Sequence, residues 1–200
     1  METRTVKRMV RHYLKKSAAY LGQVSSNGTI PENLDHIASS IALAIRGRNK
    51  IYCYGSGSSL CLANYFVAGL IDHNRNGEPA IAATAFNDAV VIGALGKRMP
   101  FDEICQRYIE LVGDPGDVIL FFSSESDEEM IVKAEQAAHS CGLHTLCITV
   151  KPSETLCRKA CACACLPAEE NAGIIRTIQF LLIDSLIQLI EKNCLIFKTE

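Results

Sequence analysis

The stretch IYCYGSGSSLCLANYF, residues 51–66, contains a strand, a loop and a helix in one segment. Its short apolar run IYCY (51–54) is typical of a buried strand, and the turn GSGSS (55–59) leads into apolar residues at helical spacing. Four more apolar runs follow and alternate with helical segments. They are AIAAT (80–84), DVILFF (117–122), HTLCITV (144–150) and ACACACL (160–166). This alternation predicts βαβ units and therefore a parallel sheet with helices on both faces.

Helices are expected in the segments that separate and follow these strands. Their approximate ranges are 58–71, 87–95, 102–112, 127–141 and 172–193.

Two further helices are expected before the first strand. Apolar residues recur at helical spacing from Val6 to Val24, with basic residues opposite, and Gly28 and Pro31 are expected to end this helix. A second helix is expected over about residues 32–46. Because both helices precede any strand, we expect residues 1–48 to form an oligomerisation arm and residues 49–200 the α/β domain, as one structural unit. The alternative for the basic first helix is a membrane-surface or nucleic-acid-binding role.

The composition argues against several functional classes. A length of 200 residues with 48% hydrophobic content suits one folded domain, and a net charge of -2 does not favour direct nucleic-acid binding. The first sixteen residues carry six Lys and Arg without an apolar core, unlike a secretory signal. The apolar stretch 174–190 is interrupted by polar residues and is expected to fall short of a membrane span. We therefore expect a cytoplasmic protein.

The ten cysteines are expected to be reduced, because nothing in the sequence directs export. Four of them lie close together at Cys157, Cys161, Cys163 and Cys165. In a strand, three of these thiols would share one face at intervals of about 7 Å, which is wide for one metal ion. We interpret them as small, half-buried residues of an outer strand, and a bound ion is the alternative.

Two serine-rich loops follow predicted strands. In open parallel sheets, ligands bind beyond the carboxyl ends of the strands, where both loops would lie. Glycines that allow a tight turn, serine hydroxyls and a following helix start make the first loop a neutral anion cradle. Its residues are Gly55, Ser56, Gly57, Ser58 and Ser59. The loop lacks the lysine of a nucleotide P-loop, and a serine-capped turn without a ligand is the alternative.

These segments together resemble the sugar isomerase (SIS) domain family. The resemblance rests on IYCYGSGSSLCLANYF, GDVILFFSS with a helix near VKAEQAA, GLHTLCITV and LIQLIEKN. Within the family it is closest to phosphoheptose isomerases and to their non-catalytic relative, the DnaA initiator-associating protein. The resemblance implies a flavodoxin-like three-layer sandwich with a five-stranded parallel sheet, a homotetramer, and a sugar phosphate as small-molecule ligand.

By that resemblance, the phosphosugar would be held by residues of both serine-rich loops. Ser59, Ser123 and Ser124 match the family's phosphate-binding hydroxyls, and the candidate site also includes Ser126 with the glycines and serines of the first loop.

The family's catalytic groups do not transfer to this sequence. Isomerisation needs a base and an acid held across the sugar. The family carries a His and a Glu where this chain has Tyr65 and Gly69, and a Gln and a His where it has Arg176 and Asp184. Some members bind zinc with these residues, but a phenol, a glycine, a guanidinium and one carboxylate are a poor ligand set. The resemblance therefore implies no metal and no other cofactor here.

A neighbouring family motif is also changed. An Asn-Asp pair beyond the second strand is matched by Lys97 and Arg98, which either bind an anion or form a solvated basic turn.

The second loop is acidic where the family loop is neutral. It reads SSESDEEM over residues 123–130. Ser126 and Glu129 have the spacing of a capping box, so the acids suit a helix start. A phosphate beside them would meet a repulsion of about 1 kcal/mol per charge pair at about 4 Å in water.

Several outcomes for this loop stay open. One outcome is a pocket that has lost phosphosugar affinity. A second is a pocket that accepts another ligand, either a cationic amino sugar or a phosphate bound chiefly by the first loop. In a third, Ser123 and Ser124 still bind phosphate while the acids face solvent.

We therefore expect a phosphosugar-binding or regulatory protein that lacks the family's acid, base and zinc site. One alternative is an active aldose–ketose isomerase of the sedoheptulose 7-phosphate type, with Asp184 or Glu125 as base. A second alternative is a module that binds a protein partner, as in the initiator-associating relative.

Overall fold

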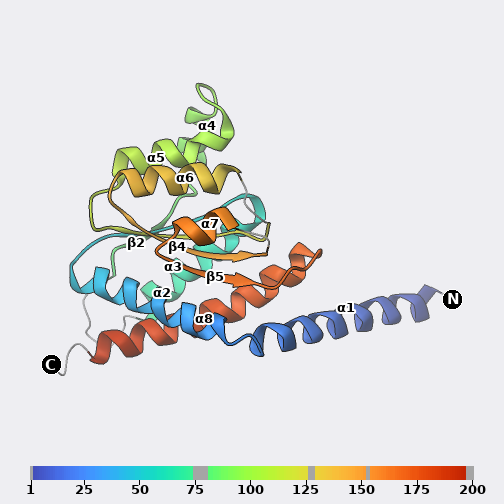
Figure 1. Cartoon of the computed structure of the whole chain (residues 1–200). Coiled ribbons are helices and arrows are strands. Elements are labelled where there is room, and N and C mark those ends of the chain that lie inside the picture. Colours follow the sequence, from blue (N-terminus) through green and yellow to red (C-terminus); the bar gives the residue numbers. More distant parts are fainter. Residues whose placement is uncertain (1, 74–80, 126–128, 152–153, 197–200) are drawn as a thin grey trace.

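The fold is an α/β sandwich with one five-stranded, wholly parallel sheet (Figure 1). The computed structural model describes residues 2–73, 81–125, 129–151 and 154–196. The strand order is β2-β1-β3-β4-β5. The strands are β1 (Ile51–Gly55), β2 (Ala83–Ala85), β3 (Val118–Phe122), β4 (His144–Val150) and β5 (Ala162–Leu166). The predicted fold class and all five predicted strands are confirmed; β4 has the predicted bounds, and the ends of the others differ by at most three residues.

The burial of the strands follows their place in the sheet. All five residues of β1 and of β3 are buried, as are all but the first residue of β4. Because helices cover both of their faces, β1 and β3 are continuous apolar runs, and β4 is largely apolar with two buried threonines, Thr145 and Thr149. In β5, at one edge, buried and half-buried residues alternate, and β2 at the other edge has no buried residue.

Two layers of helices enclose the sheet (Figure 1). Side chains of α2, α3 and α8 share one buried cluster with one face of the strands, and those of α5, α6 and α7 share another with the opposite face. The α-helices are α1 (Glu2–Ser25), α2 (Thr29–Arg46), α3 (Leu60–His73), α4 (Ala89–Leu95), α5 (Ile104–Val112), α6 (Glu129–Ser140), α7 (Glu154–Lys159) and α8 (Ala172–Ile196). Short 3-10 turns precede α3 and α5, at η1 (Gly57–Ser59) and η2 (Phe101–Glu103). The sequence analysis did not predict α7.

Helix α1 projects away from the sheet, whereas α2 belongs to the covering layer (Figure 1). The carboxyl-terminal part of α1 is anchored: Tyr20 is buried and its hydroxyl donates to the Pro167 carbonyl at 2.8 Å. Helix α2 begins three residues before the predicted start. Pro31 does not end a helix but lies in the first turn of α2, where its missing N–H removes no helical hydrogen bond.

Helix α8 is more apolar than the sequence analysis expected. By length and hydropathy, the segment Ala172–Cys194 is suitable for a membrane span, so the expectation that it falls short was wrong on composition. In the structure, however, α8 packs against α2 and α3 and buries residues on several of its sides. The buried residues are Ile174, Ile175, Ile178, Gln179, Ile183, Leu186, Ile187 and Ile190. This is the packing of a core helix.

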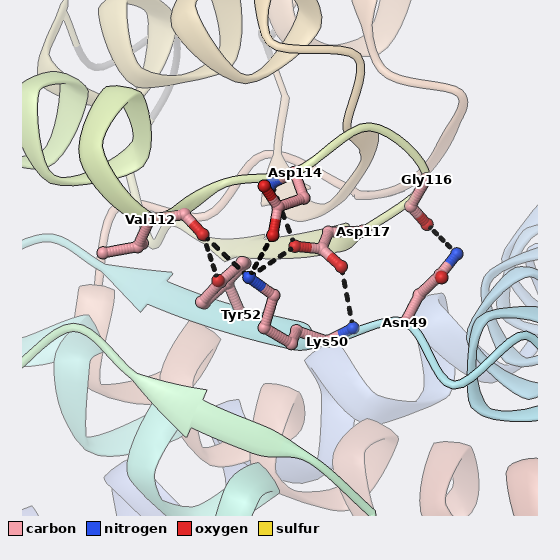
Figure 2. Close-up of polar contacts among 7 residues, drawn as sticks. All are labelled: Asn49, Lys50, Tyr52, Val112, Asp114, Gly116 and Asp117. Atoms are coloured by element: carbon pink, nitrogen blue, oxygen red, sulfur yellow. Dashed lines mark hydrogen bonds and ion pairs between the residues drawn. The ribbon is translucent and has the colours of Figure 1, made fainter.

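At the amino end of the sheet, Asp117 and Lys50 tie the start of β3 to the start of β1 (Figure 2). The buried Asp117 carboxylate accepts hydrogen bonds from the Lys50 N–H at 2.8 Å and the Asp114 N–H at 3.1 Å. The Lys50 ammonium lies 3.3 Å from Asp117 Oδ2, and it donates to Asp114 Oδ2 at 2.8 Å and to the Val112 carbonyl at 2.9 Å. The Asp114 carboxylate is the main cause of a raised pKa of Lys50. We call this group the Lys50–Asp117 clamp.

Candidate functional site

The first serine-rich loop leaves β1 in a tight turn. A side chain at Gly55 would place its Cβ 2.3 Å from the Ser59 carbonyl oxygen, so only glycine fits there. Gly57 has a φ of +51°, in the left-handed region that favours glycine. The Ser59 N–H donates to the Ser56 carbonyl at 2.9 Å, which closes the η1 turn. As a result Ser59 is buried just beyond the carboxyl end of β1, while Ser58 is exposed.

Three polar side chains from different segments meet beyond the carboxyl ends of β1 and β3. These strands are neighbours, with Gly55 in register with Phe122, so the loops that follow them lie side by side. Ser59 Oγ and Ser124 Oγ share a hydrogen bond at 3.1 Å. Arg176 of α8 donates from Nη1 to Ser124 Oγ at 3.2 Å. We call Ser59, Ser124 and Arg176 the serine–arginine cluster.

Ser123 and Gln179 shape the second loop. The hydroxyl of the buried Ser123 donates to the Glu125 carbonyl at 2.7 Å and accepts from the Glu125 N–H at 3.1 Å. Gln179 of α8 is fully buried, and its Nε2 donates to the carbonyls of Ser123 at 2.8 Å and Ile148 at 3.3 Å. Its Oε1 is buried and has no hydrogen-bond partner within the described part of the chain. Gln179 therefore fixes the second loop through its Nε2, and its Oε1 remains a hydrogen-bond acceptor next to this loop.

Tyr65 and Asp184, two of the positions matched above to catalytic groups of the SIS family, contact each other. The Tyr65 hydroxyl of α3 donates to Asp184 Oδ1 of α8 at 2.7 Å, and this carboxylate raises the pKa of Tyr65. The Tyr65 ring packs edge-on against Phe180 at 5.1 Å between ring centroids. At Gly69, a Cβ would lie 2.3 Å from Ile187 Cδ1, so α3 and α8 approach closely there.

These residues do not fit a zinc ion. Of Tyr65, Gly69, Arg176 and Asp184, only Asp184 is an ordinary zinc ligand, and it already accepts the tyrosine hydrogen bond. Arg176 brings a positive charge that would repel a cation. Within the described ranges of the chain, no group of three or more His, Cys, Asp or Glu side chains is arranged to hold a metal ion.

Of the other residues singled out in the sequence, some are exposed and some lie outside the described residues. Ser126, Asp127 and Glu128 fall in the latter class. Glu125 is exposed. Lys97 and Arg98 are exposed in the turn after α4.

Sequence reasoning missed Arg176 as a possible anion ligand and considered it only as a lost zinc position. The available signal was its place three residues before a glutamine on the last helix, since residues at that spacing share a helix face.

A separate hollow lies beside the loop after β2. Its walls include Tyr54, Phe86, Val91, Ile104 and Tyr108, and it contains no residue of the serine–arginine cluster. The apolar walls offer little to an anion.

Comparisons with known proteins agree with the fold and extend over almost all of the chain. The sequence profile of the SIS domain family matches residues 12–150. A phosphoheptose isomerase of Escherichia coli O7:K1 is 29% identical over 185 residues, which cover 92% of this chain and 96% of that protein. The structure of a phosphoheptose isomerase from Francisella tularensis superposes with a TM-score of 0.86 at 21% identity, over 94% of this chain and 98% of the other. The Vibrio vulnificus NanR protein complexed with ManNAc-6P superposes with a TM-score of 0.67 at 16% identity, over 97% of this chain and 68% of the other.

Proposed function

Because the chain belongs to the SIS domain family, we propose that it binds a phosphorylated sugar at the carboxyl ends of β1 and β3. The observation that carries this proposal is the serine–arginine cluster, in which Arg176 lies 3.2 Å from Ser124 and Ser124 lies 3.1 Å from Ser59. Two hydroxyls and a guanidinium at one point are suited to phosphate oxygens, since arginine binds phosphate through strong charge-assisted hydrogen bonds.

Arg176 also offers a way for phosphate to bind next to the acidic second loop. Its positive charge lies next to Ser124, whereas the Glu125 side chain is exposed to solvent. An exposed carboxylate is screened by water and salt, but a half-buried guanidinium within hydrogen-bond distance of a phosphate is screened less. On this proposal the phosphate is held chiefly by Arg176 with Ser59 and Ser124, and the acids remain at the rim.

We propose further that this chain does not carry out the family's isomerisation by the family's residues. Tyr65 and Gly69 offer no general base at neutral pH, because an unperturbed phenol ionises only near pH 10 and the pKa of Tyr65 is raised further. The role would then be binding or regulation. The NanR protein is a relative by fold that is complexed with ManNAc-6P, which is consistent with such a role.

Calorimetric titration of the purified full chain tests the binding proposal. Sedoheptulose 7-phosphate and inorganic phosphate are the probes, and the unphosphorylated sugar is the negative control. Arg176→Gln should weaken phosphate-dependent binding about 10- to 100-fold, because a hydrogen bond to a charged group contributes about 1.5–3 kcal/mol. Arg158→Gln, which alters an exposed arginine on α7, should leave the affinity unchanged. Equal affinity in both variants, or no heat with any phosphosugar, would refute the proposal.

A second candidate function is an active isomerase that uses Asp184. The hydrogen bond from the Tyr65 hydroxyl to Asp184 places a carboxylate and a proton donor side by side, which is an acid–base pair in principle. We expect no conversion of sedoheptulose 7-phosphate above the uncatalysed level. Conversion that survives a chelator, is lost in Asp184→Asn and persists in the exposed control Asp35→Asn would favour the isomerase instead.

We also propose that α1 joins copies of the chain into a homotetramer in the cytoplasm. Apolar side chains on its projecting part are 41–66% exposed, namely Val6, Met9, Val10, Tyr13 and Leu14. A single helix gains most of its stability from packing, so an apolar face of this extent favours a partner helix. Leu14→Glu should lower the native mass measured by light scattering, whereas Lys15→Glu should not. A monomeric wild-type chain would favour a different protein partner on this face.

A further inference from the structure

Four cysteines gather where α7 covers the edge of the sheet. Cys147 of β4 and Cys163 of β5 are register partners across the two strands. Cys157 of α7 reaches down to them, with its Sγ 2.7 Å from Cys163 Sγ. Cys165, two residues further along β5 and therefore on the same face, also adjoins Cys157. Only Cys147 of these four is fully buried.

We propose that Cys157 and Cys163 form a redox-active dithiol, which closes to an intramolecular disulfide on reaction with a small disulfide such as oxidised glutathione. The two sulfur atoms are about 0.7 Å further apart than a disulfide bond of about 2.05 Å, so closure needs little movement. Both side chains are half-buried, which leaves the pair open to a small reagent while the sheet holds it in place.

The exchange balances without a further oxidant. The Cys157 thiolate attacks one sulfur of glutathione disulfide, forms a mixed disulfide and releases one glutathione thiolate, which takes up the proton that Cys157 lost. Cys163 then attacks the Cys157 sulfur, and its proton goes to the second glutathione that leaves. Two protein thiols are oxidised, and one glutathione disulfide is reduced to two glutathione molecules.

The surroundings of Cys163 decide which sulfur attacks first. Hydrogen bonds with Cys147 and Cys157 raise the pKa of Cys163, because these contacts favour the protonated thiol. Because Cys163 packs between Cys147 and Cys157 on the sheet, we assign the first attack to Cys157 of the covering helix, in agreement with the raised pKa of Cys163.

A dithiol explains this cluster better than a metal centre. No set of three or more metal-ligating side chains in metal-binding geometry occurs among the described residues, although Cys147 adjoins Cys163 and Cys165 adjoins Cys157. Two thiolates on one tetrahedral zinc ion, each about 2.3 Å from it, would lie about 3.8 Å apart, so a sulfur pair at 2.7 Å suits disulfide exchange more than zinc.

The test is disulfide mapping of the full-length protein in glutathione buffers. Reduced protein is equilibrated at increasing ratios of oxidised to reduced glutathione, alkylated under acid quench and digested for mass spectrometry. The expected result is the loss of two of the ten alkylatable thiols, with one linked peptide pair containing Cys157 and Cys163. Ten alkylated thiols under oxidising conditions, or a dominant disulfide between other cysteines, would overturn the proposal.

Single variants separate the roles of the two cysteines. Cys163→Ser should accumulate the mixed glutathione disulfide at Cys157, and Cys157→Ser should form neither product. The control Cys161→Ser alters an exposed cysteine of the same segment and should still form the disulfide. Disulfide mapping of the wild type tests whether Cys157 and Cys163 pair, even where a variant folds poorly. Zinc that stays bound to the reduced wild type and is lost in Cys157→Ser would also contradict the proposal.

Discussion

The two ends of the sheet each carry a polar cluster, but the clusters differ in how fully their groups are hydrogen-bonded. At the amino end, Asp117 accepts from two backbone N–H groups and contacts the Lys50 ammonium. At the carboxyl end, Arg176 makes one hydrogen bond to the described residues, although a guanidinium has five N–H donors. Gln179 Oε1 there has no partner among the same residues. A cluster whose donors and acceptors are paired, such as the Lys50–Asp117 clamp, stabilises the fold. A cluster with unpaired donors and acceptors can still form hydrogen bonds with a ligand.

The largest expected effect is on stability at the amino end. Asp117→Ala removes a buried carboxylate and leaves two N–H donors without their acceptor, so the free energy of unfolding should fall by about 3 kcal/mol. Urea unfolding measures this change. Asp114→Ala removes a 74% exposed ion-pair partner of the same lysine and should cost less than about 1 kcal/mol. Similar losses in both variants would show that the clamp does not depend on the buried carboxylate.

The matching change at the carboxyl end is Gly55→Ala. Its Cβ would lie 2.3 Å from the Ser59 carbonyl oxygen, so the loop must move, at a cost of about 2 kcal/mol. We also expect phosphosugar affinity to fall at least about tenfold, because Ser59 moves with the loop. Thermal unfolding and calorimetric titration measure the two effects. Gly93→Ala, inside α4 where a Cβ meets nothing within 4 Å, is the control: it should leave the affinity unchanged and raise the stability slightly, because alanine favours a helix interior.

A smaller effect is expected at Glu135, a buried acid whose pKa is raised by burial. The charges of Lys159 and His139 and a hydrogen bond from Thr145 offset this only in part. Because the folded-state pKa is above the unfolded value of about 4.3, the neutral acid favours the native state. Its contribution to stability is complete below that value and is lost as the pH rises through the folded-state pKa.

Glu135→Gln removes this pH dependence. The variant should therefore be more stable than the wild type at pH 7, by about 1 kcal/mol, and this advantage should shrink towards pH 4. Urea unfolding at both pH values is the measurement. Glu129→Gln, on the same helix but exposed, should be nearly neutral at either pH. A Glu135 variant that loses stability at pH 7 would mean that the carboxylate is favourably paired.

The smallest effect is expected for Glu125→Ser at the rim of the phosphosugar site. Removing one exposed negative charge should raise phosphate affinity about two- to fivefold at low salt, and less at high salt. Titrations at two ionic strengths measure the difference. An affinity that is the same at both would show that Glu125 does not face the bound phosphate.

The central part of the fold was predictable because its signals are local. Strand β3 is a continuous apolar run and β4 is a largely apolar one, as is typical of strands that are buried on both faces. Helix α7 was missed because its six residues stand between a turn and a cysteine-rich run, too few for a helical period to emerge. The start of α2 was misplaced because Pro31 is as compatible with a first helical turn as with a helix end.

Contacts between side chains far apart in the sequence could not be predicted from the sequence alone. The spacing of cysteines suggested three thiols along one strand, whereas the structure brings Cys157 from a helix onto Cys163. Likewise, the sequence identified Tyr65 and Asp184 as separate departures from a family pattern, and only the packing of α3 against α8 joins them.

The sequence by itself determined that two serine-rich loops lie at one end of a parallel sheet, because parallel strands all end on the same side. It did not determine that Arg176 points at Ser124. Helix α8 is apolar on most of its sides, so its periodicity does not specify which side faces the loops. The rotation of that helix is set by packing against α2, α3 and the sheet together, and this packing exists only in the folded chain.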